Sequence, residues 1–256
     1  MSKGSVAAVE GGPVTALILA AGLGSRLREL GDSKPLTSLE GMPLIERIVR
    51  SAIEGGVTQF VVVVGYMGDV VRAAMVELSA KVKVPITCVT NDAWNLGNGR
   101  SVVAAKPLID GPFHVMMADH IYDPAILRVL RSKPLGDCGA RLGVDLNMAN
   151  PLVDLDDVTK VQLEGDRIVD IGKRIEKYNA FDTGFFYCTP KLFDAIERSI
   201  AEYNDDSLSG GMRELGRHGA AEAMDIGDRE WIDVDDQKAF TQSKGLARVR
   251  ESVKNA

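Results

Sequence analysis

A glycine-rich segment near the start of the chain combines residue types that suit polyphosphate binding. An apolar run ends at Ala20 and is followed by Gly22 and Gly24, then by Arg26 and Lys34. A glycine lets backbone N–H groups approach an anion closely, because no Cβ stands in the way. Arg26 and Lys34 add two positive charges. The segment therefore predicts a cradle for a polyphosphate, and an ordinary strand-to-helix turn with two solvated cations remains the alternative.

Two other nucleotide-binding motifs fit this segment poorly. The dinucleotide-binding pattern G-x-G-x-x-G requires a third glycine where this chain has Leu27, and no acidic residue directly ends the second apolar run. The Walker pattern G-x-x-x-x-G-K-[ST] does not occur in the sequence. These departures disfavour a nicotinamide or flavin dinucleotide and a P-loop NTPase.

Carboxylates follow two further apolar runs. Asp119 comes directly after "PFHVMMA", and Asp233, Asp235 and Asp236 belong to "WIDVDDQKAF". Mg²⁺ in phosphate-transfer sites keeps several waters and takes only one or two protein carboxylates. Helix capping by Asp119, Asp235 or Asp236 is the alternative. Because each half of the chain supplies one such carboxylate after a strand, the pattern favours a shared metal site.

The elements that must position these residues follow from the apolar periodicity. Apolar runs alternate with amphipathic patterns, which predicts βαβ units on a parallel sheet. The predicted strands cover 15–20, 59–65, 84–90 and 112–118, and the predicted helices cover 43–53, 69–78 and 99–106. In such sheets ligands bind at the carboxyl ends of the strands. The glycine-rich segment and Asp119 are therefore expected at the same edge.

In the second half of the chain the apolar residues follow a different period. After Gly139, runs of period two predict antiparallel strands, with a hairpin at the Gly165–Asp166 turn. Helices are predicted over 191–203 and 207–217, then a strand and a closing helix to about Val249. The expected fold is α/β, with a Rossmann-like, mostly parallel central sheet flanked by helices and antiparallel additions in the second half. Residues 1–13 are predicted to be a disordered leader, and residues 14–256 a single domain.

Composition excludes several function classes. The 256 residues carry a net charge of −6, which argues against nucleic acid as a partner. The three cysteines lack C-x-x-C spacing, which fits a reducing cytoplasm better than a disulfide framework or a zinc site. The longest apolar runs have the length of a strand, so no membrane insertion is expected. The sequence leaves open whether the protein forms a homodimer.

A family resemblance rests on motifs distributed along the chain. "LAAGLGSRL", followed by "SKPLTSLEGMPLIERIV", resembles the signature of nucleotidyltransferases that join a nucleoside triphosphate to a sugar phosphate or a related phosphate. "WNLGNGRSV", "MMADHIYDP" and "IGKRIEKYNAFDTGFFYC" are most similar to CTP:inositol-1-phosphate cytidylyltransferases. The resemblance implies the nucleotide-diphospho-sugar transferase type of fold. It also implies Mg²⁺-dependent transfer of CMP from CTP to a small phosphorylated acceptor, inositol 1-phosphate, giving CDP-inositol and pyrophosphate.

The resemblance also implies roles for individual residues. Arg26 would hold the β and γ phosphates of CTP, and Lys34 would reach the α phosphate. Asp119 and Asp235 match the paired metal ligands, with Asp233 as the alternate position. The residues expected to line the nucleotide are Ala20, Ala21, Gly22, Gly24, Gly97, Asn98, Gly99 and Ser101.

The acceptor side is implied in the same way. Lys173 would face the acceptor phosphate, and Asp182, Thr183 and Gly184 fall on the acceptor-side strand. The attacking phosphate is already ionised, so no general base is required. His114 and His218 are therefore expected to be structural, whereas His120, beside Asp119, is a possible ligand contact.

Two kinds of alternative remain open. Within enzymes, the acceptor could be another phosphate or a phosphonate, or the protein could be an NTP:sugar-1-phosphate nucleotidyltransferase. The non-enzyme alternative is a nucleotide-sensing module that binds nucleotide without releasing pyrophosphate. The retained Arg26, Lys34, Asp119 and Asp235 favour the enzyme.

Overall fold

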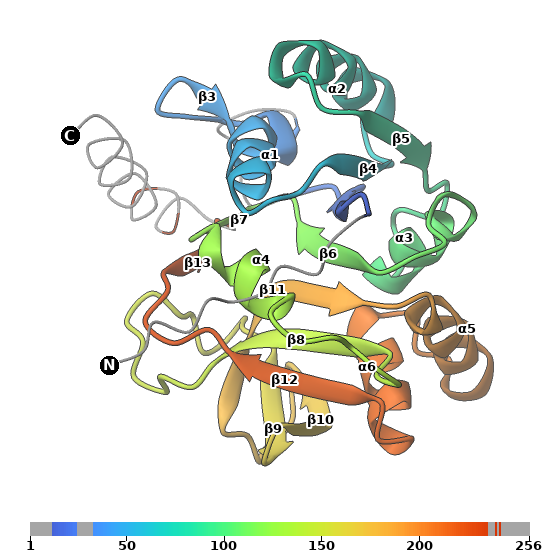
Figure 1. The fold of residues 1–256 in the computed structure, drawn as a ribbon, viewed down its shortest axis with the longest axis vertical. Helices are drawn as coiled ribbons and strands as arrows, with labels where there is room; N and C mark the ends of the chain where they lie inside the picture. The colour runs from blue at the N-terminus through green and yellow to red at the C-terminus, as the bar shows by residue number, and fades with distance from the viewer. Residues whose placement is uncertain (1–11, 25–32, 235–238, 240, 242–256) are drawn as a thin grey trace.

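A mixed β-sheet forms the centre of the molecule. The computed structural model describes residues 12–24, 33–234, 239 and 241. Within these residues nine strands form one sheet in the order β5-β4-β1-β6-β11-β8-β12-β10-β9 (Figure 1). The strands are β1 (Thr15–Ala20), β4 (Gln59–Val64), β5 (Ile86–Thr90), β6 (Phe113–Met117), β8 (Ala140–Asp145), β9 (Lys160–Glu164), β10 (Arg167–Gly172), β11 (Ala180–Cys188) and β12 (Ala221–Asp225).

The first half of the chain forms the parallel part of this sheet, as predicted. β1 pairs in parallel with both β4 and β6, and β4 pairs in parallel with β5. Successive residues of β1 enter different apolar clusters, since Ala16 and Ile18 belong to one and Leu17 to the other. Both faces of the sheet are thus buried, which explains why these strands read as continuous apolar runs.

Helices cover the two faces of the sheet. One apolar cluster is completed by α1 (Leu44–Glu54), α2 (Gly68–Val82) and α4 (Ala125–Leu130). The other is completed by α3 (Asn98–Ala104), α5 (Lys191–Tyr203) and α6 (Leu208–Arg217). Short 3-10 turns, η2 (Lys34–Leu36) and η3 (Lys106–Leu108), and a small hairpin of β2 (Ser38–Leu39) and β3 (Met42–Pro43) complete the connections.

The second half adds a mainly antiparallel part, in the lower portion of Figure 1, although β12 pairs with β8 in parallel. β11 pairs antiparallel with β6 on one side and with β8 on the other. β9 and β10 form the predicted hairpin, and its turn places Gly165 at a φ of 64°, a conformation that favours glycine. β11 is therefore the strand through which the two halves of the sheet meet.

A second, two-stranded sheet was not predicted. β7 (His120–Tyr122) pairs antiparallel with β13 (Trp231–Asp233), and this pairing sets His120 opposite Asp233. Because β7 begins directly after Asp119, no helix follows that residue. The alternative that Asp119 caps a helix is therefore wrong.

Several predictions fall on residues outside the described ranges. They concern residues 1–11 of the predicted leader, Arg26, Asp235, Asp236 and the closing helix. Among the described residues, no helix combines the length and the hydrophobicity that crossing a membrane requires.

Candidate active site

One cavity is lined by six of the predicted site residues, namely Asn98, Asp119, Lys173, Asp182, Gly184 and Asp233. Lys34 and the glycine-rich segment at 20–24 are not among its lining residues. It has a volume of about 540 Å³ and is lined by the end of β6, by β7, β11 and β13, by the starts of α3 and α6, and by the segment 151–159. Five of its lining residues carry the chemistry discussed below, namely Asp119, His120, Lys173, Asp182 and Asp233. The cavity therefore receives side chains from both halves of the sheet.

Buried Lys34 forms an ion pair with the half-buried Asp119 at the edge of this cavity. Lys34 Nζ donates to Asp119 Oδ2 at 2.6 Å, and the Lys34 side chain is only 9% exposed. Burial alone would raise the pKa of Asp119, but the adjacent charges of Lys34 and His120 hold it well below its usual range. Asp119 is therefore ionised.

The two glycines of the predicted polyphosphate cradle have different surroundings. Gly24 adopts a φ of 59°, and a Cβ at this position would overlap the Lys34 side chain, so packing requires glycine here. A Cβ on Gly22 would meet nothing within 4 Å, which leaves space above its backbone. Ala20 and Ala21 are buried, and the carbonyl of Ala21 accepts a hydrogen bond from the backbone of Tyr66.

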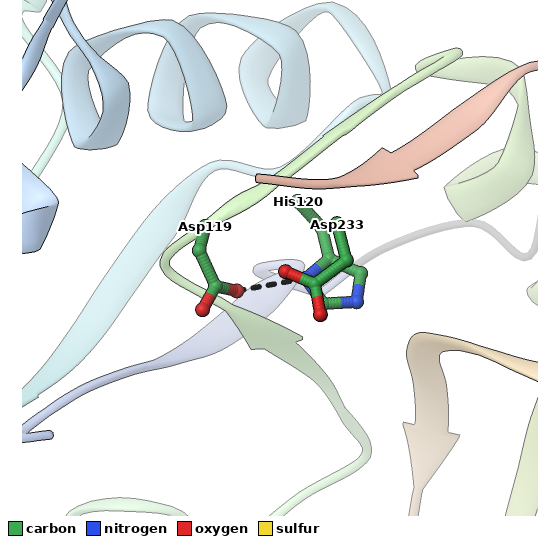
Figure 2. A group of neighbouring side chains, drawn as sticks. All are labelled: Asp119, His120 and Asp233. Atoms are coloured by element: carbon green, nitrogen blue, oxygen red, sulfur yellow. Dashed lines mark hydrogen bonds and ion pairs between the residues drawn. The ribbon is translucent and has the colours of Figure 1, made fainter. Parts of the chain in front are cut away.

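His120 lies next to two carboxylates, which both approach its Nδ1 (Figure 2). Its Nδ1 is 2.7 Å from Asp119 Oδ1 and 3.7 Å from Asp233 Oδ1. Burial disfavours the charged ring, but Asp233 and Asp119 outweigh it and raise the pKa of His120 to about 9. The ring is therefore protonated near neutral pH and donates to Asp119.

An aromatic side chain fixes the His120 ring from one side. The indole of Trp231 stacks on it with a centroid separation of 6.2 Å. The Trp231 Nε1 in turn donates to Asp145 Oδ2 at 2.9 Å. Sequence reasoning left His120 ambiguous, and only its position beside Asp119 pointed to this role.

The carboxylate pair fits the donor set of a magnesium site. Asp119, His120 and Asp233 offer ligand atoms that all lie within 4.8 Å of one another. Mg²⁺ prefers oxygen ligands, so the two carboxylates suit it, whereas a protonated imidazole suits a role in holding them. Of the three predicted metal ligands, the structure brings Asp119 and Asp233 together, and Asp235 lies outside the described residues.

Four predicted nucleotide-binding residues lie in and before α3. Asn98 lines the cavity, whereas Ser101 is buried and accepts a hydrogen bond from Asn91 Nδ2 at 3.0 Å. The backbone N–H groups of Gly97 and Gly99 both donate to Asp206. Contact with Asp206 thus accounts for glycine at these two positions, a reason that the sequence did not reveal.

The predicted acceptor-side residues divide between the cavity and the core. Asp182 and Gly184 line the cavity, and burial raises the pKa of Asp182 to about 6. Thr183 points the other way, is fully buried and donates from Oγ1 to the Gly143 carbonyl at 2.7 Å. The structure therefore does not bring the Thr183 side chain to the acceptor side. Gly184 has a φ of 78°, and a Cβ there would lie 2.7 Å from His120 Nε2.

Lys173 lines the cavity just after the end of β10. Its Nζ pairs with Asp157, a residue of the segment 151–159 between β8 and β9. Sequence reasoning missed this segment, which brings Asp154 and Asp157 to the cavity. A long connection without helix or strand periodicity was the available signal, because such connections are often functional.

The other two histidines lie away from the cavity, His114 in the core and His218 on the surface. His114 is completely buried, and its Nδ1 lies 3.2 Å from the Phe186 carbonyl. Burial lowers the pKa of His114 to about 3, so it is neutral. His218 follows α6, with its Nε2 3.2 Å from Glu214 Oε1. Neither residue lines the cavity.

Comparisons with known proteins show which family this chain belongs to. Residues 16–149 match the model of the MobA-like NTP transferase domain. A "Bifunctional IPC transferase and DIPP synthase" from Rubrobacter xylanophilus is 37% identical over 229 residues, which are 87% of this chain and 49% of that protein. A "CMP-5'-(3-aminopropyl)phosphonate synthase" from Streptomyces rubellomurinus is 30% identical over 88% of this chain and 37% of its own length.

A solved structure extends the likeness to the whole fold. The structure of the inositol-1-phosphate CTP transferase from T. maritima superimposes with a TM-score of 0.79 and 30% identity, covering 90% of this chain and 92% of that chain. This chain spans about half the length of the first two curated relatives that it matches. The predicted nucleotide-diphospho-sugar transferase type of fold is confirmed. The chain therefore belongs to the MobA-like NTP transferases, nucleotidyltransferases of the kind that its motifs predict.

Proposed function

We propose that this protein transfers CMP from CTP to inositol 1-phosphate, giving CDP-inositol and pyrophosphate. The observation that carries the proposal is the cavity lined by the carboxylates of Asp119 and Asp233 and by the ammonium group of Lys173. Such a cavity offers charged groups for two phosphorylated substrates. The likeness to the inositol-1-phosphate CTP transferase from T. maritima, which extends over 90% of this chain, supports the choice of both substrates.

The reaction follows from charge and position. An oxygen of the acceptor phosphate forms a bond to the α-phosphorus of CTP, and the bond from that phosphorus to the α–β bridging oxygen breaks. Pyrophosphate leaves with the electron pair of the broken bond. Because the attacking phosphate is already ionised, the protein contributes mainly by positioning two polyanions and compensating their charge.

Each proposed contact uses a group of this chain. Lys173 orients the acceptor phosphate, Lys34 reaches the α phosphate, and the backbone at Gly22 leaves room for the triphosphate. Arg26 is proposed to contact the β and γ phosphates, although it lies outside the described residues. Asp182 and Gly184 supply the acceptor side of the cavity.

Mg²⁺ is the proposed cofactor, with Asp119 and Asp233 as its protein ligands. When bound, the ion would offset negative charge on the reacting phosphates. Lys34 and the protonated His120 ring hold the two carboxylates and balance part of their charge. The charges of Lys34 and His120 thus keep Asp119 ionised, which is the form that a metal ligand requires.

A second acceptor class has its own supporting observation. Asp154, Asp157 and Asp182 line the same cavity as Lys173, and Asp157 pairs with the Lys173 ammonium group. Carboxylates attract an ammonium group as well as accepting hydrogen bonds from hydroxyls. An aminoalkyl phosphonate is therefore the second candidate acceptor, in line with the name of the relative from Streptomyces rubellomurinus.

Pyrophosphate release with Mg²⁺ tests the proposal directly. CTP, UTP, dTTP, GTP and ATP are each paired with inositol 1-phosphate, glucose 1-phosphate, phosphocholine and 3-aminopropylphosphonate. We expect release with CTP and inositol 1-phosphate. Release with another pair would support the same reaction but with a different nucleotide or acceptor. Nucleotide binding without release from any pair would contradict the enzyme and favour a sensing module.

A further inference from the structure

A junction between two distant segments forms one wall of the cavity. Asn98 at the start of α3, and Leu208 and Ser209 at the start of α6, all line the cavity. The backbone N–H of Leu208 donates to Asn98 Oδ1 at 2.8 Å, across 110 positions of the chain. The shape of this wall therefore depends on how the two segments are held together.

Asp206 holds this junction with both its side chain and its backbone. Its Oδ2 accepts from the Gly97 N–H at 3.1 Å and from Arg100 Nε at 2.8 Å. Its backbone carbonyl accepts from the Gly99 N–H at 2.9 Å. A Cβ at position 97 or 99 would overlap Asp206, so the two glycines permit this close approach. Three hydrogen bonds thus converge on one residue.

The same segment reaches the acceptor side of the cavity through Arg213. The Arg213 guanidinium donates to Asp205 Oδ2 and to the carbonyl of Ile171. Ile171 lies in β10, two residues before Lys173. Because one guanidinium bonds both groups, it fixes the end of β10 relative to the start of α6.

We propose that the segment 205–213 positions both walls of the site. Asp206 positions the nucleotide-side segment 97–100, and Arg213 positions the end of β10 that carries Lys173. This inference rests on the proposed function, because it assigns the two walls to CTP and to the acceptor. Asp206 and Arg213 are positioning residues, since neither lines the cavity.

Paired variants separate the two effects. Asp206→Ala removes the acceptor of two hydrogen bonds, so the KM for CTP should rise about tenfold while the KM for inositol 1-phosphate stays within about twofold. Asp206→Asn keeps an acceptor oxygen and should restore part of the loss. Arg213→Gln should instead raise the KM for inositol 1-phosphate and leave the KM for CTP nearly unchanged. Asp194→Ala is the control. It removes an exposed ion pair between Asp194 of α5 and Lys106 of η3, and it should change neither KM.

Amide hydrogen exchange gives a readout that does not depend on catalysis. The Gly97 amide should exchange at least about tenfold faster in Asp206→Ala than in the wild type, whereas amides of β4 should not change. CTP should slow exchange at residues 97–100 in the wild type. If the wild type releases no pyrophosphate but the Gly97 amide still exchanges faster in Asp206→Ala, the proposed function fails and the positioning role of Asp206 stands.

Three results would overturn the inference. The first is an unchanged exchange rate at Gly97 in Asp206→Ala. The second is an equal rise of both KM values in each variant, which would indicate a general loss of structure. The third is a lower melting temperature with both KM values unchanged. Should Asp206→Ala fail to fold, Asp206→Asn carries the same comparison with a smaller expected effect.

Discussion

The parallel and antiparallel halves of the sheet contribute to the cavity in different ways. The parallel half places Asp119 and His120 directly after the end of β6, where such sheets bind ligands. The antiparallel half contributes from the face of a strand, because Asp182, Gly184 and Phe186 of β11 line the cavity at every second position. The parallel half thus supplies Asp119 and His120 to a charged cluster that Asp233 of β13 completes, and the antiparallel half supplies a wall.

This difference suggests that the two halves of the sheet have different roles in the reaction. The cluster around Asp119 is largely shielded from solvent and linked by ion pairs, with Lys34 and His120 buried and Asp119 half-buried, which suits groups that must hold fixed positions near the reacting phosphorus. Lys173 on the antiparallel side is half exposed and pairs with Asp157. We therefore expect substitutions in the parallel half to act mainly on kcat, and those in the antiparallel half mainly on the KM for the acceptor.

The largest expected effect is that of Asp119→Ala. Turnover should fall at least about a hundredfold, because the variant removes a proposed metal ligand and the partner of Lys34 and His120. Steady-state kinetics measure the loss, circular dichroism checks the fold, and Mn²⁺ binding followed by electron paramagnetic resonance tests the metal site separately. Near wild-type turnover in a folded variant would remove Asp119 from the mechanism.

His120→Gln should have the next largest effect. A neutral amide cannot replace the charged ring beside Asp119 and Asp233, so we expect kcat to fall about thirtyfold with little change in either KM. His218→Gln is the matched control, because His218 lies after α6 and away from the cavity. Equal kinetics for the two variants would contradict the role of His120 in the cluster.

Lys173→Met tests the antiparallel half. Loss of the ammonium group should raise the KM for the acceptor about tenfold, while the KM for CTP changes less. Lys191→Met is the matched control, since Lys191 is similarly exposed at the start of α5. A drop in kcat as large as that of Asp119→Ala would break the proposed division between the two halves.

The smallest effect concerns stability alone. Burial keeps the pKa of His114 near 3, below its usual value of 6.5, so the unfolded state binds more protons between these pH values. The free energy of unfolding should therefore fall as the pH drops, by about 2 kcal/mol between pH 7 and pH 5 from this group. His114→Leu should lose that part of the dependence, as measured by urea unfolding at both pH values. Parallel pH profiles for the two proteins would contradict the assignment.

Local patterns predicted much of the fold. The strand at 15–20 and the helix at 191–203 have the predicted bounds, because the strand is a continuous apolar run and the helix carries a clear apolar period over its length. The pairing of β7 with β13 escaped prediction. Both strands are three residues long and lie more than a hundred positions apart, so no local pattern encodes their contact.

The site was predictable where chemistry and position coincide. Asp119 carries a charge just after a predicted strand, and Lys34 carries one just after the glycine-rich segment. The structure joins the two side chains in one ion pair. Thr183 illustrates a missed signal, since alternation along β11 already implies that it faces away from Asp182 and Gly184. The contact of Gly97 with Asp206 could not be read from the sequence, because it depends on tertiary packing.

The position of β11 has a consequence for folding cooperativity. One edge of β11 bonds to the parallel half through β6, and the other bonds to the antiparallel half through β8. Because β11 contributes Phe186 to one apolar cluster and Phe185 to the other, neither half can lose this strand without exposing side chains of both clusters. The two halves should therefore unfold in one transition, and a variant that loosens either wall of the cavity lowers the population of the complete site.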